Sequence, residues 1–174
     1  MAVPTIDTSR VALRPLEERD SDVLFRWIND RETVVYNAPF MAVSRAEHDQ
    51  WFARIRAAID TRIFAIETRP KPLLIGSCQL LTISATHKSA CLQVRIGESK
   101  FRGKGFGTAA VRQLLAFGWD DLGLHRVSLT VRADNARAVR AYEKSGFVRE
   151  GLLRDAAIIE GNYVDLVCMA VFAP

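Results

Sequence analysis

The sequence predicts an α+β fold: a mixed, mostly antiparallel central sheet of about seven strands, flanked by helices. Short apolar runs typical of strands recur along the chain, and amphipathic segments with helical spacing separate several of them. Three consecutive strand-like runs are joined by short polar linkers, which favours antiparallel pairing. The chain has 174 residues, of which 49% are hydrophobic, and no low-complexity segment divides it. We therefore expect one domain over residues 1–174.

The first part of the chain reads as one strand followed by helices. Residues 11–14 form a short apolar run typical of a strand. Asp20 or Ser21 can cap a helix that carries Phe25, Trp27 and Ile28. A further helix is predicted to begin at Ser44, because Ser44 and Glu47 form a capping box. Apolar residues follow this box at helical spacing: Trp51, Phe52, Ile55 and Ile59.

Strands dominate the middle and the end of the chain. The antiparallel strands are expected at residues 63–67, 73–81 and 90–96. A helix that opens near Phe106 carries its apolar side chains on one side and ends near Gly123. The last elements are expected as a strand at 127–131, a helix from Asn135 to a stop at Gly146, and strands at 148–153 and 164–171.

A glycine-rich loop lies between the strand-like run that ends at residue 96 and the helix that follows. It reads Arg102, Gly103, Lys104, Gly105, Phe106, Gly107 and Thr108. Glycines permit φ > 0 and close approach of a ligand, and the first N–H groups of a helix have no intrahelical partner. Phosphate suits such a site, and Arg102 and Lys104 add positive charge at its mouth. We therefore expect the N–H groups of residues 103–108 to hold a pyrophosphate.

The spacing of this loop excludes one nucleotide site and leaves a second open. A nucleoside-triphosphate loop needs Ser or Thr directly after Gly-Lys, whereas Gly105 follows Lys104. Residues 105–110 match the dinucleotide pattern G-x-G-x-x-A, and Asp134 follows the next strand-like run as a ribose-binding acid does. However, the loop lies in the second half of the chain, and a polar linker separates it from its strand. A dinucleotide-binding oxidoreductase is therefore the weaker alternative.

A second motif follows the strand-like run at 126–131. Residues 135–147 read Asn-x-x-Ala-x-x-x-Tyr-x-x-x-Gly-Phe, with Asn135 first and Tyr142 in the middle. In this order, the glycine loop and this motif resemble the GCN5-related N-acetyltransferase (GNAT) family over about residues 11–172. Three shorter landmarks are similar to the branch that contains ribosomal-protein N-terminal, spermidine and amino-sugar acetyltransferases: residues 13–16, 47–52 and 161–165.

The resemblance implies a sheet that splays between its fourth and fifth strands, and acetyl-CoA as the co-substrate without a metal. It implies that Tyr142 protonates the departing thiolate and that Asn135 contacts the cofactor or the acceptor. Spacing alone favours plainer roles, in which Tyr142 packs in the core and Asn135 caps a helix. The resemblance assigns cofactor binding to Val94, Arg95 and Ile96 of the strand, to Arg102, Gly103, Lys104, Gly105, Phe106, Gly107 and Thr108 of the loop, and to Asn135 and Tyr142.

The expected acceptor is a primary amine, and the chain departs from similar proteins where that amine would be activated. Many members of the branch carry Glu where this chain has Cys91. Glu98, Glu160, Asp165 and a water relay stay open as the base. Residues 30–40, expected to line the acceptor site, contain two acids, whereas each ammonium group of a polyamine must be paired or hydrated. A peptide N-terminus or an amino sugar is therefore expected, with slow or no acetylation of spermidine. A polyamine enzyme and a catalytically silent acyl-CoA-binding protein are the alternatives.

Composition narrows the expected partners and location. The net charge of +4 is dispersed along the chain, so nucleic acid is not an expected partner. No run approaches the roughly 18 apolar residues of a membrane span, and residues 1–10 lack the apolar core of a signal peptide. We expect a cytoplasmic protein with no membrane partner, and a homodimer stays open. The cysteines are expected as buried thiols, and no metal-ligand spacing connects the histidines: Cys78, Cys91, Cys168, His48, His87 and His125.

Overall fold

The computed structural model describes residues 10–36 and 38–174 and contains one seven-stranded sheet. The strands are β1 (Val11–Pro15), β2 (Arg62–Thr68), β3 (Leu74–Ser84), β4 (Ser89–Ile96), β5 (Arg126–Arg132), β6 (Val148–Ile159) and β7 (Asn162–Phe172). Their order across the sheet is β1-β2-β3-β4-β5-β7-β6, and among these strands only β4 and β5 pair in parallel. The mixed, mostly antiparallel sheet predicted from the sequence is thereby confirmed.

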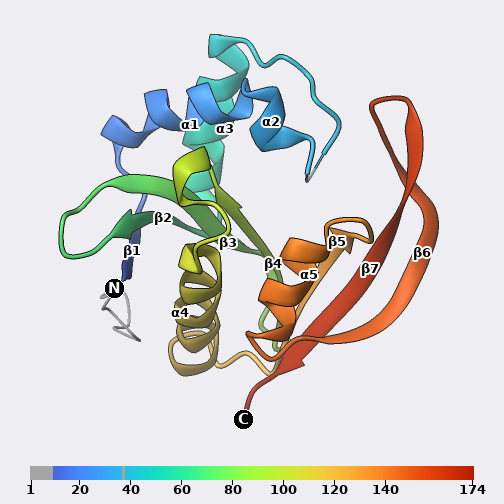
Figure 1. Ribbon diagram of the computed structural model, residues 1–174. Coiled ribbons are helices and arrows are strands. Elements are labelled where there is room, and N and C mark those ends of the chain that lie inside the picture. Colours follow the sequence, from blue (N-terminus) through green and yellow to red (C-terminus); the bar gives the residue numbers. More distant parts are fainter. Residues whose placement is uncertain (1–9, 37) are drawn as a thin grey trace.

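Helices cover both faces of this sheet (Figure 1). They are α1 (Ser21–Ile28), α2 (Arg31–Val34), α3 (Arg45–Ala57), α4 (Phe106–Asp120) and α5 (Ala136–Glu143), with 3₁₀ turns η1 (Glu18–Asp20) and η2 (Ser99–Phe101). A large apolar core unites α4 and α5 with the sheet, and a smaller one joins α1 and α3 to the opposite face. These two layers place α1 to α3 on one side of β4 and the glycine loop with α4 on the other.

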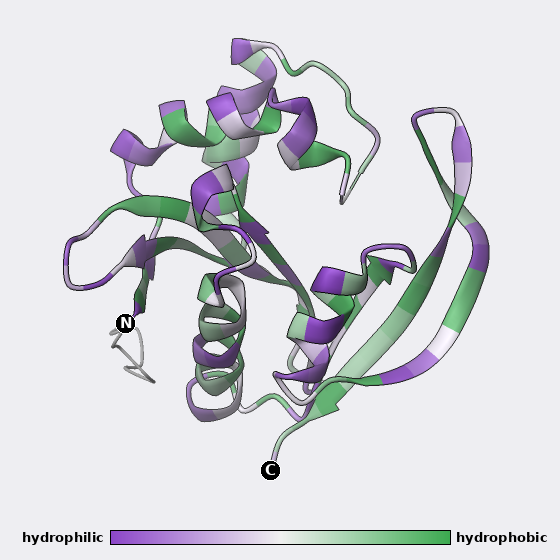
Figure 2. Cartoon of the chain, in the orientation of Figure 1, coloured by the Kyte–Doolittle hydropathy of each residue, from purple (hydrophilic) through white to green (hydrophobic). Residues whose placement is uncertain are grey.

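The amphipathic pattern of α4 explains how it packs. Val111 and Leu114 are at most 1% exposed and lie in the large core with Leu80 and Val127. Figure 2 shows hydrophobic and hydrophilic bands in alternation along this helix. Burial of such a stripe against a sheet is the main source of helix stability in proteins. The position of α4 therefore fixes the position of the glycine loop at its N-terminus.

The sheet splits between β4 and β5. Their parallel pairing consists of three residue pairs, Ser89 with Arg126, Ala90 with Val127 and Cys91 with Ser128. On its other side β4 stays paired with β3 as far as Ile96. The edge of β4 from residue 92 to residue 96 thus faces a gap instead of a neighbouring strand. This confirms the predicted splay between the fourth and fifth strands.

Local signals predict most element boundaries correctly, but the strand expected at 148–153 continues to Ile159 in β6, and one helix ends early. The capping box at Ser44 is present, since Ser44 and Glu47 bond each other's backbone N–H groups. The helix was expected to reach Ile59, but α3 ends at Ala57 and Ile59 is 90% exposed. Ala58 adopts extended backbone (φ −64°, ψ 132°), because the chain must leave the helix to enter β2. The connection to β2 therefore ends the helix before the helical pattern of apolar residues ends.

Two expectations concern parts of the chain that lie outside the description. The expected lack of a signal segment involves residues 1–10, of which 1–9 are not described, and the expected acceptor segment 30–40 includes Asn37. In the remainder of that segment, the helix α2 covers only four residues. None of the helices described has the length and apolar character needed to cross a membrane.

Candidate active site

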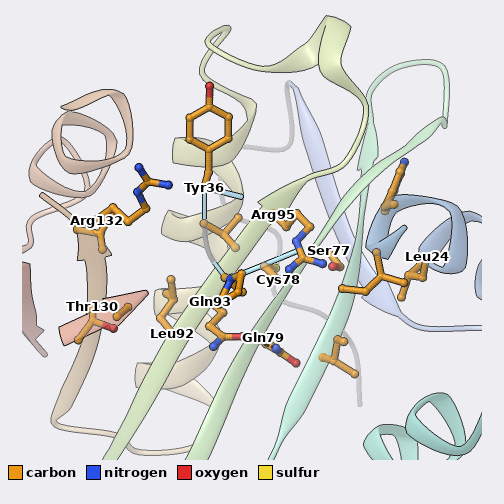
Figure 3. Close-up of a pocket in the computed structure, with 18 of the residues that line it drawn as sticks. Leu24, Tyr36, Ser77, Cys78, Gln79, Leu92, Gln93, Arg95, Thr130 and Arg132 are labelled. Atoms are coloured by element: carbon orange, nitrogen blue, oxygen red, sulfur yellow. Dashed lines mark hydrogen bonds between the residues drawn. The ribbon is translucent and has the colours of Figure 1, made fainter. Parts of the chain in front are cut away.

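A cavity of about 570 Å³ opens where β4 and β5 diverge. Its walls come from both faces of the sheet, with Trp27 of α1, Arg95 of β4, Arg132 of β5 and Tyr142 of α5 among them. Figure 3 shows Arg95 and Gln93 on β4 and Arg132 and Thr130 on β5, with Tyr36 between the two strands in this view. The split in the sheet therefore opens a cavity between its two halves.

The glycine loop lies at the start of α4 and has the geometry of an anion site. Gly103 and Gly105 adopt left-handed backbone, with φ of 71° and 85°. Gly105 is the N-cap of α4 and makes no side-chain cap, so the N–H groups of the first turn stay available. Gly107 differs from the expectation of positive φ, because it lies inside the first turn of α4. Two of the three glycines thus carry the left-handed backbone.

Of the two positive charges expected at this loop, Lys104 is exposed but Arg102 is not free. The Arg102 guanidinium donates from Nε to Ile96 O at 3.0 Å and from Nη2 to Gly97 O at 2.9 Å. It therefore ties the loop to the end of β4 and does not stand free at the mouth.

Two arginines that the sequence did not indicate lie beside the loop instead. The Arg10 guanidinium stacks 4.6 Å from the centre of the Phe106 ring. Cδ of Arg137 lies 4.0 Å from the position a Cβ of Gly103 would take. Arg137 lies two residues after the Asn135 cap, within the second motif, so its sequence position could have indicated it. Arg10 is more than ninety positions away in sequence, and no local pattern connects it to the loop.

The backbone of β4 presents free groups to the gap. Gly76 lies so close to Arg95 O that an added Cβ would be 2.2 Å from it, so the Arg95 main chain faces β3. Strand residues alternate in direction, and Arg102 reaches Ile96 O from the opposite side. The N–H groups of Val94 and Ile96 therefore point toward the gap.

Tyr142 and Asn135 both occupy α5. Tyr142 is 8% exposed, packs edge-on against Phe147 at 5.7 Å and still lines the cavity. Burial raises the pKa of Tyr142 to about 12, so its phenol stays protonated at neutral pH. Asn135 caps α5, and its side-chain oxygen accepts from Ala138 N at 3.2 Å. The two plainer roles read from spacing are confirmed, and the catalytic roles stay predictions.

The three acids expected as possible bases are all engaged elsewhere. Although burial raises the pKa of Glu98, hydrogen bonds from Trp27 and Arg26 outweigh it and hold that pKa below its usual value. Glu160 accepts from Arg31 Nε at 2.7 Å, at the tip of the β6–β7 hairpin. Asp165 accepts from the backbone N–H of Asp155 at 2.9 Å. Among the described residues that line the cavity there is neither Asp nor Glu.

Packing and exposure describe the positions of His48 and of the three cysteines. His48 is 2% exposed, Nε2 lies 3.0 Å from Ser21 Oγ, and burial lowers its pKa. All three cysteines are free, but only Cys78 is buried; Cys91 is exposed, contrary to expectation, because it points away from the apolar core of the sheet. Across residues 10–36 and 38–174, no group of three His, Cys, Asp or Glu side chains is arranged to hold a metal.

Comparison with known proteins agrees with this geometry. Residues 10–148 match the family model of the acetyltransferase (GNAT) domain. The spermidine N(1)-acetyltransferase of Vibrio cholerae is 32% identical over 94% of this chain and 93% of its own length. A Bacillus licheniformis protein named uncharacterized N-acetyltransferase p20 is 30% identical over 93% of this chain and 92% of its own.

A solved structure extends this similarity to the fold. The crystal structure of the V. cholerae spermidine N-acetyltransferase in complex with CoA and spermine has a TM-score of 0.88. It is 30% identical in sequence and matches over 94% of this chain and 96% of that one. Family model, sequence and structure thus agree with one another. The chain belongs to the GNAT family of N-acetyltransferases.

Proposed function

We propose that this N-acetyltransferase moves the acetyl group of acetyl-CoA to a primary amine by direct attack within a ternary complex. The observation that carries the proposal is the open edge of β4 beside the uncapped N-terminus of α4. The first feature offers backbone N–H groups to a thioester, and the second offers them to a pyrophosphate. The two features are neighbours, since a Cβ at Gly107 would lie 3.7 Å from Ile96 Cγ1, and this suits a long ligand that carries a phosphate at one end.

The residues present fit acetyl-CoA. An anion held by the N–H groups of residues 103–108 needs an unobstructed backbone, and Gly105 provides it. A Cβ at Gly105 would lie 2.9 Å from Arg10 Nη1, so a side chain would fill this cradle. Lys104, Arg10 and Arg137 supply positive charge nearby, and Phe106 and Thr108 belong to the same first turn of α4.

The chain's residues support each part of the transfer. The amine nitrogen forms a bond to the thioester carbon, and the C–S bond breaks to release a thiolate. Backbone N–H groups of Val94 and Ile96 stabilise the negative charge that develops on the carbonyl oxygen. Tyr142, which is protonated at neutral pH, gives its proton to the thiolate. Because Glu98, Glu160 and Asp165 are engaged, water takes the amine proton and returns it to the Tyr142 phenolate, which restores the phenol.

The acceptor is proposed to be a peptide N-terminus or an amino sugar. The cavity supports this choice, because the described residues that line it include aromatic side chains but no carboxylate. A polyamine is the second candidate, favoured by the names of the V. cholerae relatives. The absence of acids from this lining argues against it, since each ammonium of a polyamine needs a counter-charge or water.

The test measures thiol release from acetyl-CoA with purified protein and a panel of amines. The panel contains a short peptide with a free N-terminus, an amino sugar and spermidine, and mass spectrometry identifies the N-acetylated product. Thiol release that requires both acetyl-CoA and an amine supports the proposal. CoA binding without thiol release for any amine would instead indicate a silent acyl-CoA-binding protein, and tighter binding of NAD would favour the dinucleotide alternative.

The wider setting of the enzyme is also proposed. We propose a single catalytic domain that acts in the cytoplasm without nucleic-acid or membrane partners. A homodimer is supported by the edge strand β6, which leaves Val148, Leu152 and Ile158 at least half exposed. Unpaired edges with exposed apolar side chains readily pair with a second chain.

A further inference from the structure

We infer that Arg95 recognises the acceptor, and that its guanidinium binds an oxyanion carried by the molecule whose amine is acetylated. The inference rests on the proposed function and narrows its substrate class to amines that also bear a carboxylate or a phosphate. It assigns to the Arg95 side chain a role apart from the cofactor contact expected of this part of β4.

Arg95 is a partly buried cation that lacks a counter-ion within the described chain. Its Nε is buried and has no hydrogen-bond partner there. Burial lowers the pKa of Arg95, and no neighbouring acid opposes that effect. By contrast, Arg132 across the cavity is neutralised by Asp134, with contacts of 2.9 and 2.6 Å. A buried, unpaired charge is strongly unfavourable, so a ligand anion is the expected partner.

The neighbours of Arg95 in the sheet explain why nothing in the chain pairs with it. Its direct partner on β3 is Ser77, and the next residue in that row is Ala65 on β2. Leu24 and Trp27 of α1 line the cavity on the same side. Figure 3 shows the Arg95 side chain beside Ser77 and on the side toward Leu24. The surroundings are therefore neutral or apolar in every direction that these elements cover.

The sheet separates Arg95 from the expected phosphate site. Successive strand residues point to opposite faces, and Val94 and Ile96 pack against the core that contains α4. Arg95 therefore points to the face covered by α1, away from the glycine loop at the start of α4. An anion that reaches Arg95 belongs to the acceptor and not to the pyrophosphate of acetyl-CoA.

A second buried atom without a partner lies in the same cavity. Nε2 of Gln79 donates to Gln93 Oε1 at 2.7 Å, and Oε1 of Gln79 is buried and has no partner in the described chain. This oxygen accepts hydrogen bonds, whereas the Arg95 guanidinium donates them. An acceptor that carries both N–H groups and an oxyanion satisfies the two atoms together. A polyamine can donate a hydrogen bond to Gln79 Oε1, but it offers no oxyanion to Arg95. It also places a positive charge beside the Arg95 guanidinium.

The experiment compares paired amines that differ in the oxyanion. L-phenylalanine is compared with L-phenylalaninamide to test a carboxylate, and glucosamine 6-phosphate with glucosamine to test a phosphate. For at least one of the two pairs, we expect kcat/KM to be at least about tenfold higher for the anionic member. A charge-assisted hydrogen bond contributes a difference of this size. Arg95→Met should abolish that preference through a higher KM while the neutral member changes less than about threefold. Arg95→Lys should retain part of the preference for the anionic member, because the positive charge remains but the planar guanidinium with its paired donors is lost.

A control variant and a stability measurement separate an effect on recognition from an effect on folding. Arg54→Met removes an exposed arginine of α3 and should change neither preference nor melting temperature. Arg95→Met should raise the melting temperature of the ligand-free protein by about 2–4 °C, because it removes an unpaired buried charge. A raised melting temperature together with the lost preference identifies a residue kept for binding.

Several outcomes would overturn the inference. Equal or better rates for the neutral member of both pairs, or spermidine as the best acceptor, would exclude an anionic acceptor. An equal loss for both members of a pair in Arg95→Met, or weaker CoA binding in that variant, would assign Arg95 to structure or to the cofactor. Thiol release with neutral amines alone defeats only this inference, whereas no thiol release with any amine defeats the proposed function with it.

Discussion

Tyr142 packs in the core and is also the proposed proton donor. Its ring belongs to the core beside Phe147, which accounts for its burial without any catalytic role. The same burial keeps the pKa near 12, so the phenol is a proton donor and not a phenolate across the physiological range. A residue of this kind is best tested by removing the hydroxyl alone.

Tyr142→Phe should retain the fold and the affinity for CoA, because the ring still fills its place in the core. We expect kcat to fall by about 10²-fold, the scale of a lost general acid. Pre-steady-state and steady-state thiol release measure kcat, and calorimetry measures CoA affinity. An unchanged kcat would leave Tyr142 as a packing residue only.

At the scale of an element, left-handed glycines set the backbone conformation of the loop that we propose as the phosphate site. Gly105 has φ of 85° at the N-cap of α4, and Gly123 has φ of 61° just beyond its C-terminus. Both glycines avoid the strain that an L side chain meets in this region. Only Gly105 lies beside the expected phosphate, so the two positions form a matched pair.

Gly105→Ala and Gly123→Ala should each destabilise the protein by about 1–2 kcal/mol through left-handed strain. Only Gly105→Ala should also weaken CoA binding, by at least about tenfold, since its Cβ enters the anion cradle. Thermal unfolding and calorimetry measure the two effects separately. Equal CoA affinity in both variants would place the pyrophosphate elsewhere.

The predictions that the structure confirms rest on local sequence signals or on the family resemblance. Capping at Ser44, the splayed pair of strands and the loop before α4 all follow from short motifs or from the family resemblance. The errors arose where contacts between distant parts of the chain decide: Arg102 donates to Thr33 Oγ1, and Arg10 lies beside the loop. Likewise, the unpaired state of Arg95 depends on which residues face it across β3 and α1. No single-sequence pattern encodes such neighbours.

At the scale of the whole molecule, the gap between the half-sheets divides the amide groups of β4 into two classes. The main chain of Arg95 faces β3, whereas the N–H groups of Val94 and Ile96 face the gap. Hydrogen exchange distinguishes the classes, because an amide without a partner exchanges faster.

Acetyl-CoA should slow hydrogen exchange at Val94 and Ile96 and leave Arg95 nearly unchanged, because only the first two gain a partner. Residue-resolved NMR with and without the ligand measures this difference. The amide of Ile66, in the paired interior of β2, is a control that should not respond. Uniform slowing along β4 would indicate general stabilisation and contradict specific contacts to this edge.

The ion pair between Arg31 of α2 and Glu160 at the tip of the β6–β7 hairpin joins two elements that are far apart in the sequence. Its side chains are 66% and 43% exposed, and pairs of this kind contribute about 0–1 kcal/mol. A second link, from Arg132 Nη1 to Val35 O at 2.7 Å, lies deeper. The exposed Arg31–Glu160 pair therefore breaks at a cost near thermal energy and is weakened by salt. Separation of α2 and Val35 from the C-terminal half of the sheet requires the release of two arginines, and it leaves the backbone pairing of β5, β6 and β7 intact.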